Sequence, residues 1–284
     1  MLKIKFKRTK HMAIFNSFIF DNIDSLSQGV YITGEAVYNA PERAVEMITI
    51  PGKNGDLTID QGRFENIDVK YPAGCFAKTQ SEFAEKIRNI RNVLASRYNY
   101  VRLEDTYNPD EFRLALYKSG VEVDPVEYSR AGKFDIVFNC KPQRFLKSGE
   151  VPYDFVTSYD GLTDENSVQL QNENGVDIEG GVGFSNNIVN PTDFEAKPLI
   201  HAKGNGIVNL GSQRITIEGL PSNNTDIYID CEAMEIYTKN GSVISSASSY
   251  VTFNTANFPV IPKGTSGFTY TMDIADIIPR WWRI

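Results

Sequence analysis

The sequence of 284 residues has few of the residues from which catalytic and metal-binding sites are usually built. It contains only two histidines, His11 and His201, and three cysteines, Cys75, Cys140 and Cys231. The cysteines form no CxxC pair and are odd in number, so we expect reduced and mostly buried thiols instead of a disulfide framework. With two histidines, the chain offers no metal cluster of a known pattern and no recognisable base for a nucleophile.

The sequence also lacks an excess of basic residues and a long apolar run. Lys and Arg number 29 against 36 Asp and Glu, and the resulting formal net charge of -7 argues against an electrostatic nucleic-acid binder. No stretch approaches the ~18 consecutive apolar residues that a membrane-spanning helix requires, so we expect no membrane insertion. A hydrophobic content of 41% is typical of packed globular proteins, and the length suits one large domain or two of average size.

Motifs that would indicate an enzyme are missing as well. The sequence has no GxSxG, GxxxxGK[ST] or HExxH motif, and the glycines from Gly204 to Gly211 do not have the GxGxxG spacing. Acidic residues between Asp160 and Glu179 could ligate calcium, but their spacing does not fit an EF-hand and favours an exposed acidic loop. The sequence therefore predicts no catalytic, cofactor-binding or metal-ligating residue and no cofactor, although its many carboxylates leave glycoside hydrolysis open as an alternative.

What the sequence does contain is a recurring strand pattern. Short runs rich in Val, Ile, Thr, Tyr and Phe alternate with Gly, Pro, Asn and Asp, which predicts a mainly antiparallel β architecture. Examples of these runs are Gly29–Thr33, Ala44–Ile50, Phe134–Phe138, Arg214–Glu218 and Asp226–Asp230. Asn-Gly and Asp-Gly pairs, which tolerate the positive φ of tight hairpin turns, lie between several of the runs.

One segment has the period of an α-helix. Apolar residues recur at the spacing of one helix face at Phe83, Ile87, Ile90 and Leu94. Thr79 followed by Glu82 forms a capping box, so the pattern predicts a helix over residues 80–96. The opposite face carries charged and polar residues that could bind phosphate or a partner, although a solvated face is the preferred interpretation. These residues are Glu85, Lys86, Arg88, Arg91 and Asn92.

A change of composition after Pro142 divides the chain. We predict an N-terminal domain over residues 1–147, with residues 1–11 as a possible basic extension, and a C-terminal domain over residues 148–284. The chain ends in Pro279-Arg-Trp-Trp-Arg-Ile284, a bulky segment that we expect to dock as a closing strand. Because adjacent residues of a strand point to opposite faces, Trp281 and Trp282 cannot form one flat platform for a sugar, and we expect them to anchor the fold or its assembly.

Several short motifs, taken in order, resemble one known family. The motifs of the first half are Phe18-Ile-Phe20, Gly29-Val-Tyr-Ile, Ile50-Pro-Gly-Lys-Asn-Gly-Asp-Leu57, the capped helix and Asn139-Cys-Lys-Pro142. Those of the second half are Asn190-Pro-Thr-Asp-Phe-Glu-Ala-Lys-Pro198, Ile229-Asp-Cys-Glu232, Asn257-Phe-Pro259, Ile261-Pro-Lys-Gly264 and Pro279-Arg-Trp-Trp. Over about residues 14–284 this order resembles the siphophage distal tail proteins (Dit). The basic leader lies outside the pattern.

The resemblance implies a non-enzymatic virion protein of a phage or prophage tail tip, made in the host cytoplasm. It implies an N-terminal α+β domain that builds a ring, typically of six copies, and a C-terminal galectin-like β-sandwich. The implied partners are the tail tube protein, a tail-associated lysin or tail fibre protein, and receptor-binding or baseplate proteins, while DNA passes through the channel without specific binding. The alternative function is a carbohydrate-binding module that engages host cell-wall saccharide.

Overall fold

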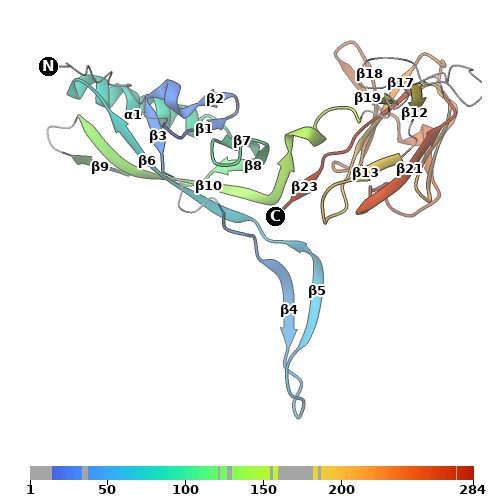
Figure 1. Cartoon of the computed structure of the whole chain (residues 1–284), viewed down its shortest axis with the longest axis horizontal. Coiled ribbons are helices and arrows are strands. Elements are labelled where there is room, and N and C mark those ends of the chain that lie inside the picture. Colours follow the sequence, from blue (N-terminus) through green and yellow to red (C-terminus); the bar gives the residue numbers. More distant parts are fainter. Residues whose placement is uncertain are drawn as a thin grey trace, which may run out of the picture. The chain divides into compact units, whose positions relative to one another are not determined.

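The computed structural model describes residues 15–33, 38–120, 122–126, 130–153, 156–158, 182–184, 187–272 and 274–284. It divides into two compact units, one of residues 1–144 with Ile284 and one of residues 145–283, coloured from blue to green and from green to red in Figure 1. Within the described residues the chain is mainly β with one α-helix, so the predicted fold class is confirmed. The basic leader and the acidic segment between Asp160 and Glu179 lie outside the described residues.

Unit 1 is built on one antiparallel sheet with the strand order β2-β1-β7-β8-β10-β6-β3, and β9 also pairs with β10. Its strands are β1 (Phe18–Phe20), β2 (Ile23–Asp24), β3 (Val30–Ile32), β6 (Ile67–Phe76), β7 (Val101–Asp105), β8 (Glu111–Tyr117), β9 (Val123–Val126) and β10 (Ala131–Leu146). The longest ladder joins β10 to β6, from the pair Ala131↔Phe76 to the pair Cys140↔Ile67. Two further strands, β4 (Arg43–Ile48) and β5 (Leu57–Phe64), pair only with each other among the described residues.

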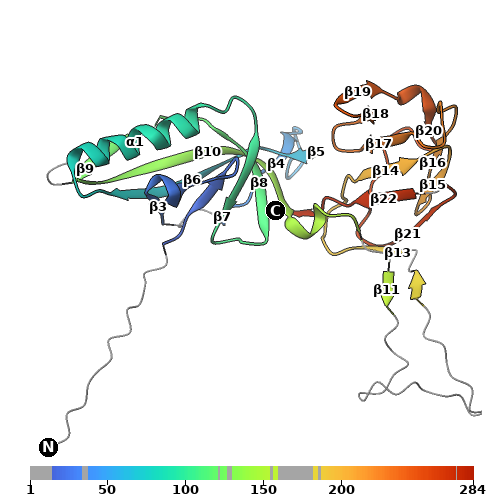
Figure 2. The same ribbon diagram turned by 90° about the horizontal axis from the view of Figure 1, so that it is seen from above.

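The predicted helix is α1 (Gln80–Ala95), which lies along β6 and β10 in Figure 2. Its four periodic apolar residues are all buried in the core of unit 1, so the predicted inward face is confirmed. The Glu82 amide donates to Thr79 Oγ1 at 3.2 Å, whereas the Glu82 carboxylate accepts from the amide of Lys78, one residue before the cap, at 2.8 Å. Because strand side chains alternate, β10 supplies Phe134, Ile136 and Phe138 to the same core.

Unit 2 is a sandwich of two five-stranded antiparallel sheets, ordered β13-β21-β15-β16-β20 and β19-β18-β17-β14-β22. The first sheet contains β13 (Asn187–Asn190), β15 (Gly206–Leu210), β16 (Gln213–Ile217), β20 (Val251–Phe253) and β21 (Gly264–Tyr270). The second contains β14 (Leu199–Lys203), β17 (Asp226–Asp230), β18 (Glu235–Asn240), β19 (Val243–Ser246) and β22 (Ile274–Ile278). The short strands β11 (Val156–Ser158) and β12 (Val182–Phe184) pair with each other. Alternate aliphatic side chains from both sheets, such as Ile215 and Ile229, meet in one buried core.

The C-terminal segment closes the core of unit 2. Trp281 is 3% exposed and packs with the sandwich core, while its carbonyl accepts the Leu146 amide at 2.8 Å. Trp282, in the last strand β23 (Trp282–Arg283), is only half-buried, with its ring stacked 4.4 Å from that of Phe194. The segment therefore anchors the sandwich through Trp281, as expected, and the two tryptophans do not share a platform.

Candidate assembly surface

A long hairpin arm extends from unit 1. It consists of β4, β5 and the turn of residues 49–56, and Figure 1 shows it running out from the sheet instead of joining it. The pairs Ile48↔Leu57 and Glu46↔Ile59 fix its register, and a shift of register occurs between Arg43 and Val45. Gly52 and Gly55 adopt φ of +80° in the turn, a conformation that glycine adopts without strain, which explains why this segment forms a tight reversal.

The arm exposes apolar side chains on both of its faces. Met47 is 59% exposed on one face, and Leu57 and Ile59 are 45% and 44% exposed on the other. Val45, Ile48 and Ile50 are exposed as well. A two-stranded hairpin on its own is marginally stable in water, and exposed apolar surface of this kind marks an interaction site. The arm is therefore a candidate for docking on another surface.

Two ion pairs lie along the arm. Arg43 pairs with Asp60, and Arg63 pairs with Glu65 at 2.9 Å. The hydrogen bond from Arg43 and that from the amide of Gly62 lower the pKa of Asp60 from its ordinary value. Both ion pairs are solvent-exposed, so they orient side chains along the arm and contribute little to its stability.

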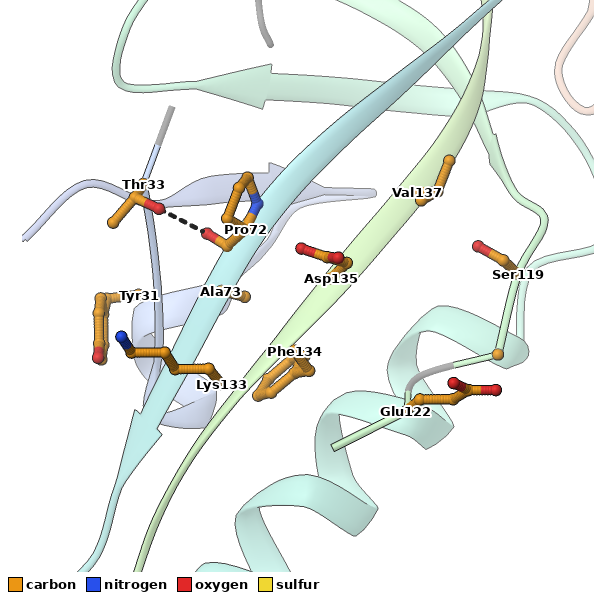
Figure 3. A pocket seen from close by; sticks show the side chains of 11 residues that line it. Tyr31, Thr33, Pro72, Ala73, Ser119, Glu122, Lys133, Phe134, Asp135 and Val137 are labelled. Atoms are coloured by element: carbon orange, nitrogen blue, oxygen red, sulfur yellow. Dashed lines mark hydrogen bonds between the residues drawn. The ribbon is translucent and has the colours of Figure 1, made fainter. Parts of the chain in front are cut away.

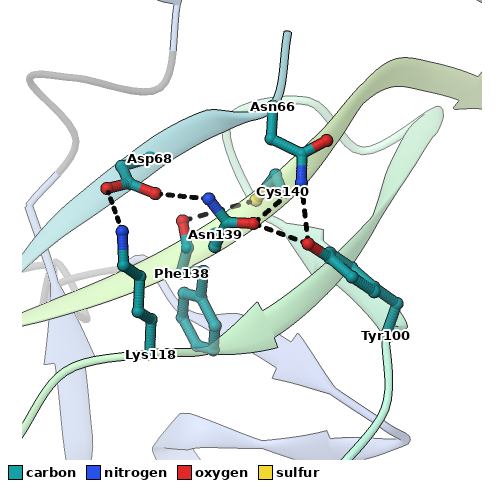
Figure 4. Close-up of polar contacts among 7 residues, drawn as sticks. All are labelled: Asn66, Asp68, Tyr100, Lys118, Phe138, Asn139 and Cys140. Atoms are coloured by element: carbon teal, nitrogen blue, oxygen red, sulfur yellow. Dashed lines mark hydrogen bonds and ion pairs between the residues drawn. The ribbon is translucent and has the colours of Figure 1, made fainter.

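A hydrogen-bond network fixes the root of the arm, where β5 passes into β6 (Figure 4). Asn139 Nδ2 donates to Asp68 Oδ1 at 2.7 Å, and the hydroxyl of Tyr100 donates to Asn139 Oδ1 at 2.6 Å. Asn66 Nδ2 donates to the Tyr100 hydroxyl at 2.7 Å, and Lys118 Nζ lies 3.3 Å from Asp68 Oδ2. The bond from Asn139 is the main reason that the pKa of Asp68 is lowered. The network joins β6 to β10 and to the start of β7, so it sets the direction in which the arm leaves the sheet.

An open trough of about 710 Å³ lies on unit 1, mainly on the face of β6 and β10 that points away from the core. Figure 3 shows Lys133, Asp135 and Val137 along β10, with Tyr31 and Pro72 beside them. The ring of Tyr31 stacks 5.1 Å from that of Phe76, which is 56% exposed. Asp135 is paired with Lys70 at 2.6 Å. The trough thus places the aromatic ring of Tyr31 near the charged side chains of Lys133 and Asp135, a combination that a protein-docking surface can use.

The polar face of α1 offers fewer side chains for binding phosphate or a partner than its sequence suggests. Lys86 is not available for a ligand, because its ammonium pairs with Glu82 at 2.8 Å and donates to the carbonyl of Phe76 at 2.8 Å. A shallow groove remains beside Phe83 and Ile87, with Arg88 and Arg91 on its rim.

The described residues contain no cluster of His, Cys, Asp and Glu side chains that could hold a metal ion. Burial raises the pKa of both the Cys140 and the Cys231 thiols to about 12, which leaves them protonated and unreactive. His201 lies on the surface of unit 2, where its ring nitrogens contact the carboxylates of Asp226, at 2.9 Å, and Asp276, at 3.4 Å. No helix in the described part of the chain has the length and hydrophobicity needed to cross a bilayer.

No family model and no curated protein matches the sequence. Solved structures, however, match nearly the whole chain. One is the crystal structure of the Dit (gp 19.1) protein of SPP1, a paradigm of the hub adsorption apparatus in phages that infect Gram-positive hosts. It matches with a TM-score of 0.57 at 14% sequence identity, and the match covers 92% of this chain and 96% of the SPP1 chain. The chain has the fold of a Dit protein. A chain of the phage P2 baseplate in its activated, Ca-containing conformation has a TM-score of 0.52 at 12% identity and covers 93% of this chain and 97% of its own.

The Dit resemblance that the motifs indicated is therefore confirmed at the level of the fold. Sequence reasoning predicted a strand over residues 44–50 and included the segment Ile50–Leu57 among the motifs of this family, but it did not identify the arm as an exposed element. A pattern of alternating apolar residues is the same for a strand inside a sheet and for one outside it. The only signal for exposure was the concentration of Gly, Asn and Lys in the turn.

Proposed function

We propose that this protein is a structural component of a phage or prophage tail, where copies form a ring at the distal end of the tail tube and join the tube to the adsorption proteins. The observation that carries the proposal is the arm, which exposes apolar side chains on both faces in a chain with the Dit fold. We infer that the arm of one copy seats on the next copy, with the trough beside Tyr31 and Val137 as its receiving surface.

The arrangement of these surfaces is compatible with a ring. The arm and the trough are different surfaces of the same unit, so the arm of each copy can contact the trough of the next copy in a head-to-tail arrangement. Head-to-tail contacts close into a ring when the rotation between copies fits, and a closed ring leaves no unsatisfied end. Six copies is the number that the Dit resemblance implies.

The partners follow from the same resemblance. We propose that the tail tube protein docks on one side of the ring and a tail-associated lysin or fibre protein on the other, with receptor-binding or baseplate proteins on unit 2. The protein is proposed not to be an enzyme. A formal net charge of -7 per copy suits a channel through which DNA passes without tight binding to phosphate.

The test is the mass of the protein in solution, measured by light scattering across a range of concentrations. We expect the wild-type protein to assemble, alone or with its tail partners, and the arm variant Met47→Lys/Ile59→Lys to remain monomeric with an unchanged circular dichroism spectrum. Tyr98→Lys, at a residue that is 88% exposed outside the arm, serves as the control and should assemble normally.

Two results would contradict the proposal. The first is a wild-type protein that stays monomeric at every concentration, with and without tail partners. The second is an arm variant that assembles like the wild type. Binding on a glycan array by a strictly monomeric protein would favour the carbohydrate-binding alternative, and release of reducing sugar from cell-wall material would favour a hydrolase.

A further inference from the structure

The sandwich of unit 2 has four sheet edges, and they differ in how they are covered. Tyr153 covers two of them, because its hydroxyl accepts the Val189 amide of β13 at 3.1 Å and its own amide donates to the Ile277 carbonyl of β22 at 2.8 Å. The edge strand β20 is only three residues long. The fourth edge is β19, and among the described residues only β18 pairs with it.

The hydrogen-bonding groups of β19 can be assigned from its ladder. The Ala247 amide donates to the Ile236 carbonyl at 2.9 Å, and antiparallel strands alternate between bonded and non-bonded pairs. The pairs Thr238↔Ser245 and Asn240↔Val243 are therefore bonded. It follows that Ile244 and Ser246 direct their N–H and C=O groups away from β18.

This edge carries no charge, proline or bulge that would prevent strand addition. Residues 241–249 read Gly-Ser-Val-Ile-Ser-Ser-Ala-Ser-Ser, without a charge or a proline. Val243 and Ile244 point to opposite faces of the strand and are 62% and 64% exposed. Natural proteins protect exposed edges with charges, prolines or bulges, since an unprotected edge is a template for another strand. An edge with both apolar faces exposed and no such protection indicates that a strand occupies it in the assembled state.

The proposed ring argues against a second copy of the chain as the occupant, and this step rests on the proposed function. Pairing of β19 with β19 of another copy is a two-fold contact, which joins copies in pairs and cannot continue around a ring. Pairing of β19 with β22 of a neighbour would be head-to-tail, but Tyr153 already takes the Ile277 carbonyl of that edge. We propose that β19 receives an extended strand of a different tail protein, which adds a sixth strand to the sheet β19-β18-β17-β14-β22.

The side chains beside β19 indicate the chemistry of that strand. On the outer face a row of stacked rings runs from His201 to Tyr228, 4.6 Å apart, and on to Tyr237, a further 5.3 Å away. The row ends at Ser246, which lies opposite Tyr237, and the Lys239 ammonium lies over the two tyrosine rings, 4.6 Å from that of Tyr228 and 5.3 Å from that of Tyr237. A large apolar or aromatic side chain opposite Ser246 would complete the row. The occupant is therefore an extended segment with a bulky residue at that position, bound through its main chain in the manner of strand addition.

Amide hydrogen exchange tests this proposal, because it distinguishes alternate residues of one strand. We would compare the purified protein with tails isolated from the phage that encodes it. In the free protein, the Val243 and Ser245 amides should be protected by β18, whereas the Ile244 and Ser246 amides should exchange freely. In the tails, Ile244 and Ser246 should gain at least about tenfold protection.

Two variants and a control sharpen the comparison. Ile244→Lys places a charge on the edge, and Ser246→Pro removes an outward N–H while leaving the bonds to β18 intact. Both should assemble into rings of wild-type mass, and in tails the remaining outward amide should exchange as fast as in the free protein. Met234→Lys changes a residue that is 69% exposed in the β17–β18 turn and should behave like the wild type.

The possible outcomes separate this inference from the proposed function. If the protein is missing from the tails, the proposed function itself fails. If the protein is present but Ile244 and Ser246 exchange as in the free form, the strand-addition proposal is overturned. It is overturned equally if purified rings without other tail proteins already protect these two amides, because the occupant would then be another copy of this chain.

Discussion

The C-terminal segment allows a quantitative prediction, because it places two adjacent tryptophans in different surroundings. Trp281 is 3% exposed in the sandwich core, with the ring of Tyr153 packed edge-on at 6.4 Å. Burial of ~150–250 Å² at ~25 cal/mol per Å² corresponds to about 4–6 kcal/mol, and measured Trp→Ala changes in cores cost about 3–5 kcal/mol. We therefore expect Trp281→Ala to lower the free energy of unfolding of unit 2 by about 4 kcal/mol.

Trp282 provides the matched control one residue away. Its ring stacks on Phe194 at 4.4 Å, and its Nε1 donates to the Glu195 carbonyl at 2.9 Å. An aromatic pair contributes about 0.5–1.5 kcal/mol and a hydrogen bond about 1 kcal/mol, so Trp282→Ala should cost about 1–2 kcal/mol.

Differential scanning calorimetry and urea unfolding followed by far-UV circular dichroism would measure both variants without relying on tryptophan fluorescence. With ~2–4 °C per kcal/mol for a domain of this size class, Trp281→Ala should lower the Tm of unit 2 by roughly 8–16 °C, at least twice the shift of Trp282→Ala. Equal shifts, or a larger shift for Trp282→Ala, would refute the assignment of Trp281 as the anchor of the sandwich.

Two further predictions concern the same unit. Gly149→Ala should destabilise it by about 1–3 kcal/mol, because a Cβ would collide with the backbone nitrogen of Trp281, whereas Gly267→Ala, which meets no atom within 4 Å, should be tolerated in the same thermal melt. Burial by itself would raise the pKa of Asp230, but the bonds from Arg280, at 2.6 and 2.8 Å, and from the amides of Ala233 and Glu232 lower it overall. Because the pKa of Asp230 is lower in the folded state than its unfolded value of ~3.9, the ionised carboxylate stabilises the fold at any pH above that unfolded pKa. This stabilisation is lost as the pH falls through the folded-state pKa. The difference in Tm between wild type and Asp230→Asn should therefore be constant above about pH 5 and shrink below about pH 4. A difference that grows on acidification would contradict this.

The elements that the sequence predicts well are those whose pattern has a local cause. The helix was predictable because the spacing of Phe83, Ile87, Ile90 and Leu94 and the cap at Thr79 act within a few residues of each other, and the structure places α1 over Gln80–Ala95. The strands over residues 214–218 and 226–230 likewise correspond to β16 and β17 within one residue at their ends.

The features that matter for assembly have non-local causes. The sequence of residues 43–64 does not show that β4 and β5 pair only with each other among the described residues. This isolation depends on other strands, because β6 already pairs with β10 on one side and with β3 on the other. The same holds for the trough, which Tyr31 and Val137 form from strands more than 100 positions apart in the sequence. The sequence likewise does not reveal that β19 lies at the edge of its sheet, because that depends on which strands pair with it and not on its own residues.

The two units differ in how complete they are as isolated structures. In unit 2 the anchors are internal, because Trp281 fills the core and Arg280, held at a φ of +55°, is fixed by its two bonds to Asp230. In unit 1 the hydrogen-bond network that includes Asp68 and Asn139 holds the root of the arm, and the apolar side chains of the arm face solvent on both sides. Ordering a hairpin of this kind costs conformational entropy, and burial of its apolar side chains against another surface offsets that cost. The contact between copies that we propose would cover the arm of unit 1, which is why the arm variants, and not variants of the sandwich core, are expected to separate assembly from folding.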